Sequence, residues 1–268
     1  MRARWTRAGW TLLGLAAATV VLLASPRAMA APPWVDRHLT LPAGAWAFDM
    51  GLGLGFAPGP PEAVGAGINL EAAVGLTDRV ELGLRTGLRL GDAGDRALEP
   101  DNYGRLFDRE YVAGREDVVA NPELRVRGAL LRGPLLDLAL EGRLFVPIEG
   151  NQAALEFGVP IALHLGDSVR LDTGVYIPML LDYTPPFGLI IPIDLWVQLT
   201  PRFWLGPMTG FNVVRYADNA TVTDVSMGFG VGYQILRNLD FKSMFLFPAL
   251  NQNSGVFGLG AGVQIRLE

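Results

Sequence analysis

The sequence predicts an all-β chain of twelve antiparallel strands that run up and down. Three observations lead to this prediction. Apolar residues recur at every second position through most of the 268 residues, the segments with this repeat number twelve, and the connections between them are alternately short and long. A two-residue repeat is typical of β-strands with one apolar face. The long, regular alternation therefore indicates a large antiparallel sheet.

The composition excludes several other classes of protein. Half of the residues are hydrophobic and only 18% are charged, whereas disordered chains are poor in apolar residues and rich in charge. The chain contains no cysteine, which excludes disulfides, thiolate metal sites and cysteine nucleophiles. After residue 30 no apolar run approaches the ~18 residues of a membrane-spanning helix. The hydrophobicity is therefore spread along the chain.

The first 30 residues have the features of a cleavable signal peptide. Arg2, Arg4 and Arg7 form a basic start, an apolar stretch follows over 12–24, and Ala28-Met29-Ala30 supplies the small residues of a cleavage site. Removal of residues 1–30 takes away four arginines and leaves 18 basic against 27 acidic residues, which changes the net charge from −5 to about −9. Such an acidic protein is not expected to bind nucleic acid.

The strand repeat is clearest near the two ends of the remaining chain. Over 45–56, large apolar residues alternate with glycine, alanine and aspartate, and over 255–267 they alternate mainly with glycine. We expect strands at 45–56, 64–76, 80–90, 118–129, 135–147, 153–165, 168–178, 189–199, 202–211, 221–235, 239–247 and 255–267. The connections after the even-numbered strands are tight, and most of those after the odd-numbered strands are longer.

The apolar face of these strands meets either lipid or an enclosed ligand. In a soluble barrel of lipocalin type it would point inward, but that architecture has eight strands. The polar face here is largely glycine and alanine, which is a poor solubilising surface. The expected strand lengths match the ~9–11 residues that cross a bilayer. These points favour a transmembrane β-barrel, closed because unpaired edge amides in lipid have no water to bind.

The signal peptide, the six amphipathic hairpins and the alternating connections resemble those of the Gram-negative outer-membrane β-barrels, specifically the twelve-stranded, porin-like ones. This resemblance implies a single barrel over 45–268 in the outer membrane, with short turns in the periplasm and long loops outside. It implies outer-membrane lipid and lipopolysaccharide as surroundings. A monomer is the default state, because the lipid-facing strands show no evident seam for a trimer. One departure is the C-terminus, Ile265-Arg266-Leu267-Glu268, where such proteins usually end in an aromatic residue.

Charged residues with inward parity gather on the third to fifth strands. We predict that they line the lumen, either as a strip that binds or selects small solutes or as mutually neutralising pairs that close the interior. These candidate residues are Arg79, Glu81, Arg85, Arg89, Glu123, Arg125, Arg127, Asp137, Glu141 and Arg143.

Two further segments add alternatives. The loop 92–117 holds eight acids and four arginines, and it either folds inward as a constriction, covers the pore mouth, binds divalent ions or is simply solvated. The N-terminal segment 31–44 contains His38 and either plugs the periplasmic mouth or stays unattached.

The expected function is a narrow channel for the passive passage or binding of small solutes. The first alternative is a non-conducting structural or surface-interaction barrel. The second is an outer-membrane lipid hydrolase, which would need a catalytic base on the outside of the barrel, whereas the parity of His164 points it inward. We therefore expect no enzymatic activity and no catalytic residue. We also expect no metal site and no cofactor.

Overall fold

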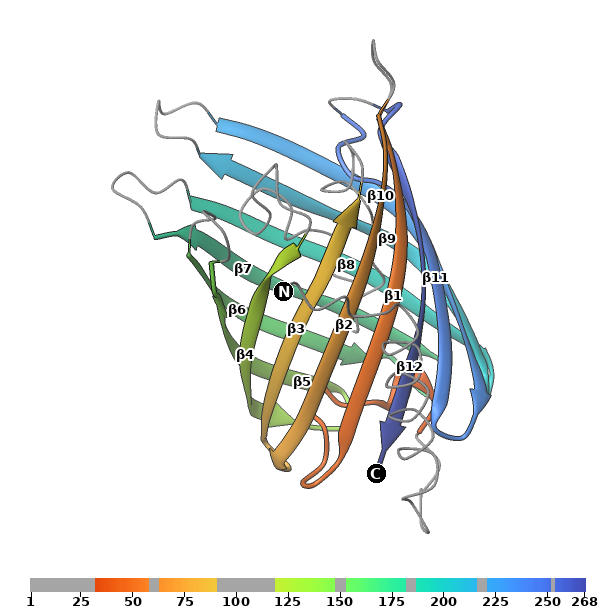
Figure 1. Ribbon diagram of the computed structural model, residues 1–268. Helices are drawn as coiled ribbons and strands as arrows, with labels where there is room; N and C mark the ends of the chain where they lie inside the picture. The colour runs from red at the N-terminus through yellow and green to blue at the C-terminus, as the bar shows by residue number, and fades with distance from the viewer. Residues whose placement is uncertain are drawn as a thin grey trace, which may run out of the picture.

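The computed structural model shows a closed barrel of twelve antiparallel strands (Figure 1). It describes residues 32–57, 63–90, 119–147, 153–181, 187–215, 221–251 and 254–268. The strands are β1 (Trp46–Ala57), β2 (Ala63–Thr77), β3 (Val80–Leu90), β4 (Val119–Arg132), β5 (Leu136–Phe145), β6 (Ala154–His164), β7 (Val169–Leu180), β8 (Phe187–Thr200), β9 (Phe203–Arg215), β10 (Thr221–Leu236), β11 (Leu239–Phe247) and β12 (Phe257–Leu267).

Each strand pairs with its neighbour in sequence, and β1 pairs with β12 to close the sheet. The closing register runs without a shift from Trp46 opposite Leu267 to Phe56 opposite Phe257. No strand edge is left open, as a sheet in hydrocarbon requires. The predicted fold class is confirmed.

Short connections join β2 to β3, β4 to β5, β6 to β7, β8 to β9 and β10 to β11. All five lie at one end of the barrel, here called the turn end (Figure 1). The other ends of these strands lie at the opposite end of the barrel, called the loop end. The predicted signal peptide 1–30 and the loop 92–117 lie outside the described residues. Among the described residues, no helix has the length and apolar character needed to cross a membrane.

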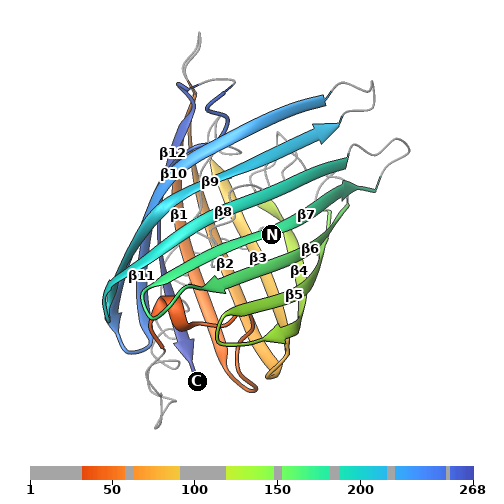
Figure 2. The same ribbon diagram turned by 180° about the vertical axis from the view of Figure 1, so that it is seen from behind.

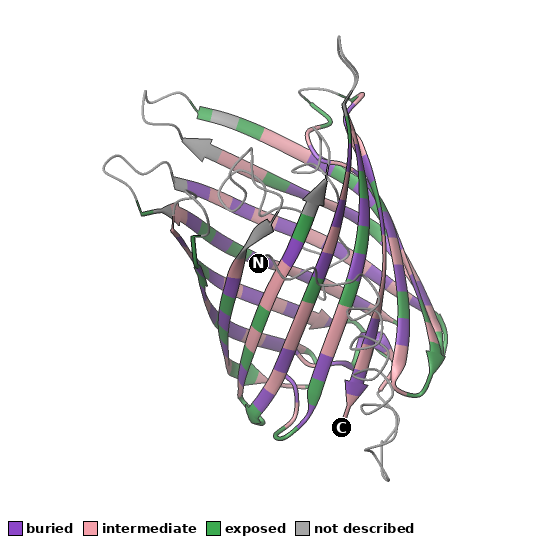
Figure 3. Ribbon diagram, viewed as in Figure 1, coloured by how far each residue is buried: buried purple, intermediate pink, exposed green. Residues whose placement is uncertain are grey.

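The strands present their apolar residues to the outside. Leu52, Leu82 and Leu259 are 53%, 37% and 44% exposed, and buried and exposed residues alternate along the strands (Figure 3). The charged residues of opposite parity are buried although they lie in the same strands. Since one face of a closed barrel is its interior, the exposed leucines lie on the outer surface and the charged residues line the lumen.

Most predicted strand ends differ from the observed ones by up to three residues, and the largest difference is at the end of β9. The sequence predicts an end at residue 211, whereas β9 continues to Arg215. Val213 and Val214 pair with Thr223 and Val222 of β10, so β-branched residues extend this hairpin beyond the point where the simple alternation stops.

Candidate functional site

The charged lumen residues come together because the strand register places opposite charges side by side. Arg85 of β3 lies opposite Glu123 of β4, and Arg127 of β4 lies between Glu81 of β3 and Glu141 of β5. Cross-strand neighbours on one face of an antiparallel sheet are close enough to interact directly. The three strands β3, β4 and β5 thus bring these charges together in one group.

These residues form ion pairs along the inner wall, and we call the group the arginine–glutamate cluster. Arg125 Nη2 lies 2.8 Å from Glu71 Oε1 and 2.9 Å from Glu81 Oε1. Arg143 lies 2.9 Å from Glu123 through Nη1 and 2.8 Å from Glu141 through Nε. The cluster consists of Glu71, Glu81, Arg85, Glu123, Arg125, Arg127, Glu141, Arg143 and Glu156.

A glycine makes one of these contacts possible. Arg125 and Arg143 lie directly opposite each other, which by itself is an unfavourable pairing. The guanidinium of Arg125 lies over Gly83, where a Cβ atom would approach it to 2.9 Å. The missing side chain therefore lets Arg125 reach across β3 to Glu71 on β2, away from Arg143.

The centre of the cluster is fully buried. Arg127 is 0% exposed, pairs with Glu141 and donates from Nη1 to the carbonyl oxygen of Leu39 at 2.9 Å. The nearby Arg85 side chain is 15% exposed and lies 3.7 Å from Glu123. Mutual pairing offsets the desolvation cost of the buried charges. Of the four arginines in the cluster, Arg85 has the most exposed side chain.

Seven of the ten predicted lumen residues belong to the cluster, and the other three do not. Asp137 is buried at the turn end, where it contacts the N-terminal segment. Arg79 has the inward parity but lies in the β2–β3 turn and is exposed, because the strand alternation no longer sets side-chain direction within a turn. The Arg89 side chain lies outside the described residues. Glu71 and Glu156 were not among the predicted site residues, although both have inward parity on the neighbouring strands β2 and β6.

The N-terminal segment, residues 32–45, lies inside the barrel at the turn end (Figure 2). It contains the 3-10 turn η1 (Trp34–Asp36). The backbone N–H of Val35 donates to Gln198 Oε1 of β8 at 3.4 Å, and that of Leu41 donates to Glu81 Oε2 of β3 at 2.9 Å. Only a segment within the lumen can contact inward groups of strands on different sides of the barrel.

Trp34 anchors the segment on the wall. Its ring stacks on Trp204 with centroids 5.4 Å apart and meets Trp196 edge-on at 6.0 Å. The two wall tryptophans lie over Gly232 and Gly230 of β10, where a Cβ atom would come within 2.1 Å and 2.7 Å of the rings. Because the two glycines have no side chains, Trp204 and Trp196 can lie flat against β10, and Trp34 can pack on them.

Arg37 provides the charged anchor of the segment. It is buried, forms an ion pair with Asp240 of β11 and donates to Gln264 Oε1 of β12 at 3.3 Å. Its guanidinium carbon lies 5.4 Å from the Trp34 ring centroid, within the range of cation–π attraction. Its carbonyl oxygen accepts a hydrogen bond from Arg170 of β7. Aromatic, ionic and backbone contacts together hold the segment in the lumen.

Comparisons with known proteins bear on the fold. An outer membrane channel from Pseudomonas putida F1 matches with a TM-score of 0.60 at 12% identity, covering 85% of this chain and 97% of that one. The NanC porin matches with a TM-score of 0.58 at 8% identity over 81% and 98% of the two chains, and the KdgM porin with 0.55 at 9% over 82% and 98%. No protein-family model and no curated protein matches the sequence.

The closed twelve-stranded barrel with an apolar outer surface is thus the fold that this outer membrane channel and these two porins also have. The likeness agrees with the predicted barrel architecture. His164 is buried and faces the N-terminal segment inside the lumen, so its position gives no support to the alternative of a lipid hydrolase acting from the outer surface.

Proposed function

We propose that the protein is a narrow outer-membrane channel for small solutes whose turn end, in the periplasm, is constricted by the N-terminal segment. The observation that carries this proposal is the polar lumen, in which buried arginines and carboxylates of the wall face inward while the outer surface is apolar. A barrel with a purely structural role does not need such a charged interior. Channels, in contrast, select the solutes that pass through them with charged linings.

Glycines provide the room for a solute path near the loop end. They face inward on three adjacent strands, since Leu52, Leu54 and Leu259 between them face outward. The strand register sets Gly53 opposite both Gly67 of β2 and Gly260 of β12. The patch consists of Gly51, Gly53, Gly55, Gly65, Gly67, Gly258, Gly260 and Gly262. Because these glycines carry no side chains, the wall takes up less of the lumen there than a wall of larger residues would.

The similarity to a channel and to two porins supports this function but concerns the fold, because the identities are only 8% to 12%. The second candidate is a non-conducting structural barrel. Buried pairing in the arginine–glutamate cluster and the lodged segment favour it, since both reduce the free cross-section of the lumen.

Single-channel recording in planar bilayers separates the two. The channel proposal predicts steady current steps for the purified protein, and inserted but electrically silent protein would exclude it. Insertion is checked independently by the shift in gel mobility between unheated and boiled samples, because closed barrels resist unfolding in SDS.

The Arg85→Ser variant should conduct with a changed ion preference. The side chain of Arg85 is partly exposed to the lumen, and in a water-like medium its charge attracts an anion ~4 Å away by about 1 kcal/mol. Loss of this attraction corresponds to about a fivefold shift of the permeability ratio toward cations. The reversal potential in a salt gradient measures it. The control is Arg79→Ser, the same change at an exposed turn residue. Equal reversal potentials for wild type and Arg85→Ser would refute a role of the cluster in selection.

A further inference from the structure

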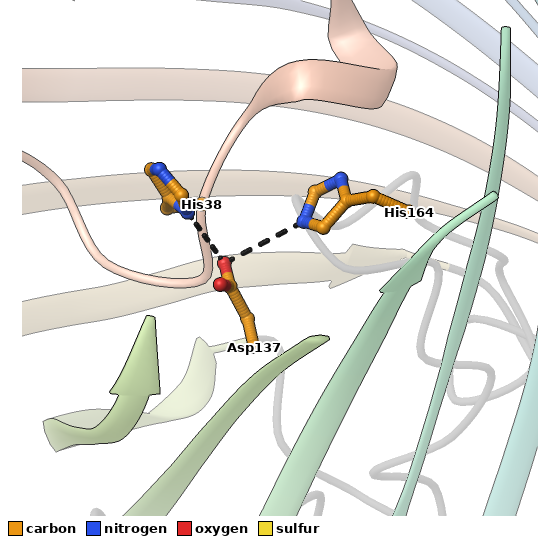
Figure 4. A group of neighbouring side chains, drawn as sticks. All are labelled: His38, Asp137 and His164. Carbon is orange, nitrogen blue, oxygen red and sulfur yellow. Dashed lines mark hydrogen bonds and ion pairs between the residues drawn. The ribbon is translucent and has the colours of Figure 1, made fainter. Parts of the chain in front are cut away.

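Two histidines and an aspartate meet where the N-terminal segment touches the wall (Figure 4). His38 belongs to the segment, Asp137 lies at the start of β5 and His164 ends β6. One nitrogen or oxygen atom from each lies within 4.8 Å of the other two. These are the two histidines that the whole chain contains, although 126 positions separate them in the sequence.

The hydrogen bonding of His164 leaves one ring nitrogen available. Its Nδ1 lies 2.6 Å from the carbonyl oxygen of Val35. Because a carbonyl oxygen can only accept, Nδ1 carries the proton, and in a neutral ring Nε2 then carries a lone pair. The His164 side chain is 9% exposed, and Nε2 lies 3.7 Å from Asp137 Oδ2. Within the part of the chain that the structure describes, Nε2 has no hydrogen-bond partner. Two acceptor atoms thus face each other in a buried place, an arrangement that a cation between them would stabilise.

The carboxylate of Asp137 is held in position by the backbone. The N–H of Gly133 donates to Oδ1 at 3.1 Å, and the N–H of Leu39 donates to Oδ2 at 3.2 Å. His38 Nδ1 lies 2.8 Å from the same Oδ2. The carboxylate oxygen is therefore fixed between the two imidazole rings, with one nitrogen of each directed toward it.

We propose that His38 Nδ1, Asp137 Oδ2 and His164 Nε2 bind a divalent transition-metal ion of the zinc type. Two imidazole nitrogens and one carboxylate oxygen are a usual set of three protein ligands for Zn²⁺, with water in the fourth position. A tetrahedral site with metal–ligand bonds of ~2.0–2.1 Å places its ligand atoms about 3.3 Å apart. The observed separations of 2.8 Å and 3.7 Å from Asp137 Oδ2 lie on either side of this value.

The hydrogen bond from His164 to Val35 completes this arrangement. A histidine that binds a metal commonly donates its second ring N–H to a backbone carbonyl or a carboxylate, which fixes the orientation of the ring. The segment would thus contribute one ligand, His38, and one supporting group, the Val35 carbonyl. A bound ion would fasten the segment to β5 and β6. The proposal depends on where the segment lies and not on whether the barrel conducts.

Equilibrium titration of the purified full-length mature protein tests this proposal. The protein is prepared in detergent without a polyhistidine tag and titrated with Zn²⁺ in competition with a chromophoric chelator. We expect one Zn²⁺ per chain with a dissociation constant of about 1 μM or lower. Excess Mg²⁺ should not displace it, since Mg²⁺ prefers oxygen ligands.

Matched variants locate the ion. Asp137→Asn and His164→Gln should each weaken binding at least about 100-fold, because even the loss of a supporting group commonly costs 10- to 100-fold. The control is Asp49→Asn, the same change at an inward carboxylate that pairs with Lys242, and it should bind as wild type does. Should a wall variant fail to give a folded barrel, His38→Ala makes the same test, since His38 lies outside the strands.

The proposal would be overturned by two results. One is a Zn²⁺ affinity of the wild-type protein that is no higher than the affinity of the His38→Ala variant. The other is binding that survives in folded Asp137→Asn, which would assign the ion to other carboxylates of the chain. Neither result would bear on the single-channel current of the wild-type barrel, so this test and the test of channel function are independent.

Discussion

Deletion of residues 32–41 is expected to raise the single-channel conductance severalfold. This part of the segment contacts inward groups on strands from β3 to β12 and so lies across the lumen at the turn end. Current through a pore is limited by its narrowest section, and removal of the obstruction widens that section. The deletion keeps the Pro42–Ala45 turn, whose backbone hydrogen bonds tie Gly44 and Ala45 to Gly75 of β2.

The barrel itself should tolerate this deletion. Its strand-to-strand hydrogen bonds do not involve the segment, and partners such as Asp240 would face water once Arg37 is removed. Planar-bilayer recordings of wild type, the deletion and Trp34→Ala give the comparison. The point variant is expected to fall between the other two, because it loses the contacts of the Trp34 ring but keeps the ion pair of Arg37 with Asp240. An unchanged conductance in a deletion protein that still shows the mobility shift of a folded barrel would contradict the proposed constriction.

The second large effect is expected on stability. Arg127→Met should lower the free energy of unfolding by about 3–5 kcal/mol, the usual result of removing one partner of a buried ion pair. Arg127 is fully buried. Its removal leaves the Glu141 carboxylate with Arg143 as its remaining guanidinium partner among the described residues, and it takes away the hydrogen bond to the Leu39 carbonyl oxygen. Urea unfolding in detergent micelles, followed by tryptophan fluorescence, measures the loss.

The double variant Arg127→Met/Glu141→Met serves as the control. Replacing both partners by apolar residues removes the uncompensated charge, and such replacements are commonly neutral. We therefore expect the double variant to recover most of the lost stability. A single variant within about 1 kcal/mol of wild type would show that the cluster is solvated, in the range typical of exposed pairs.

The wall of the barrel could be predicted from the sequence because each wall residue has only two surroundings. Successive residues of β1 and β12 face lipid and the lumen in turn. The sequence therefore alternates between leucine and glycine along much of these strands. The same alternation predicts that Glu81, Arg125 and Arg127 face inward. It does not say which charges pair, since that depends on the register between strands and on the space above Gly83.

The position of the segment could not be predicted in this way. Arg37 and Asp240 are 203 residues apart, and no local pattern links them. The signal that points to a docking place is a tryptophan after two prolines in a short segment. With it go glycines at 230 and 232 of β10, next to β9 with Trp204 and one strand further from β8 with Trp196. His38, Asp137 and His164 likewise form a group only once the segment enters the lumen.

Accessibility of spin labels along β1 tests most directly which face of the wall meets lipid. Because the chain has no cysteine, single cysteines at positions 51 to 55 can be labelled without background in protein reconstituted into vesicles. Labels at 52 and 54 should collide mainly with oxygen, which dissolves in acyl chains, and labels at 51, 53 and 55 with a water-soluble nickel complex. A reversed pattern, or equal accessibility at all five positions, would contradict the account.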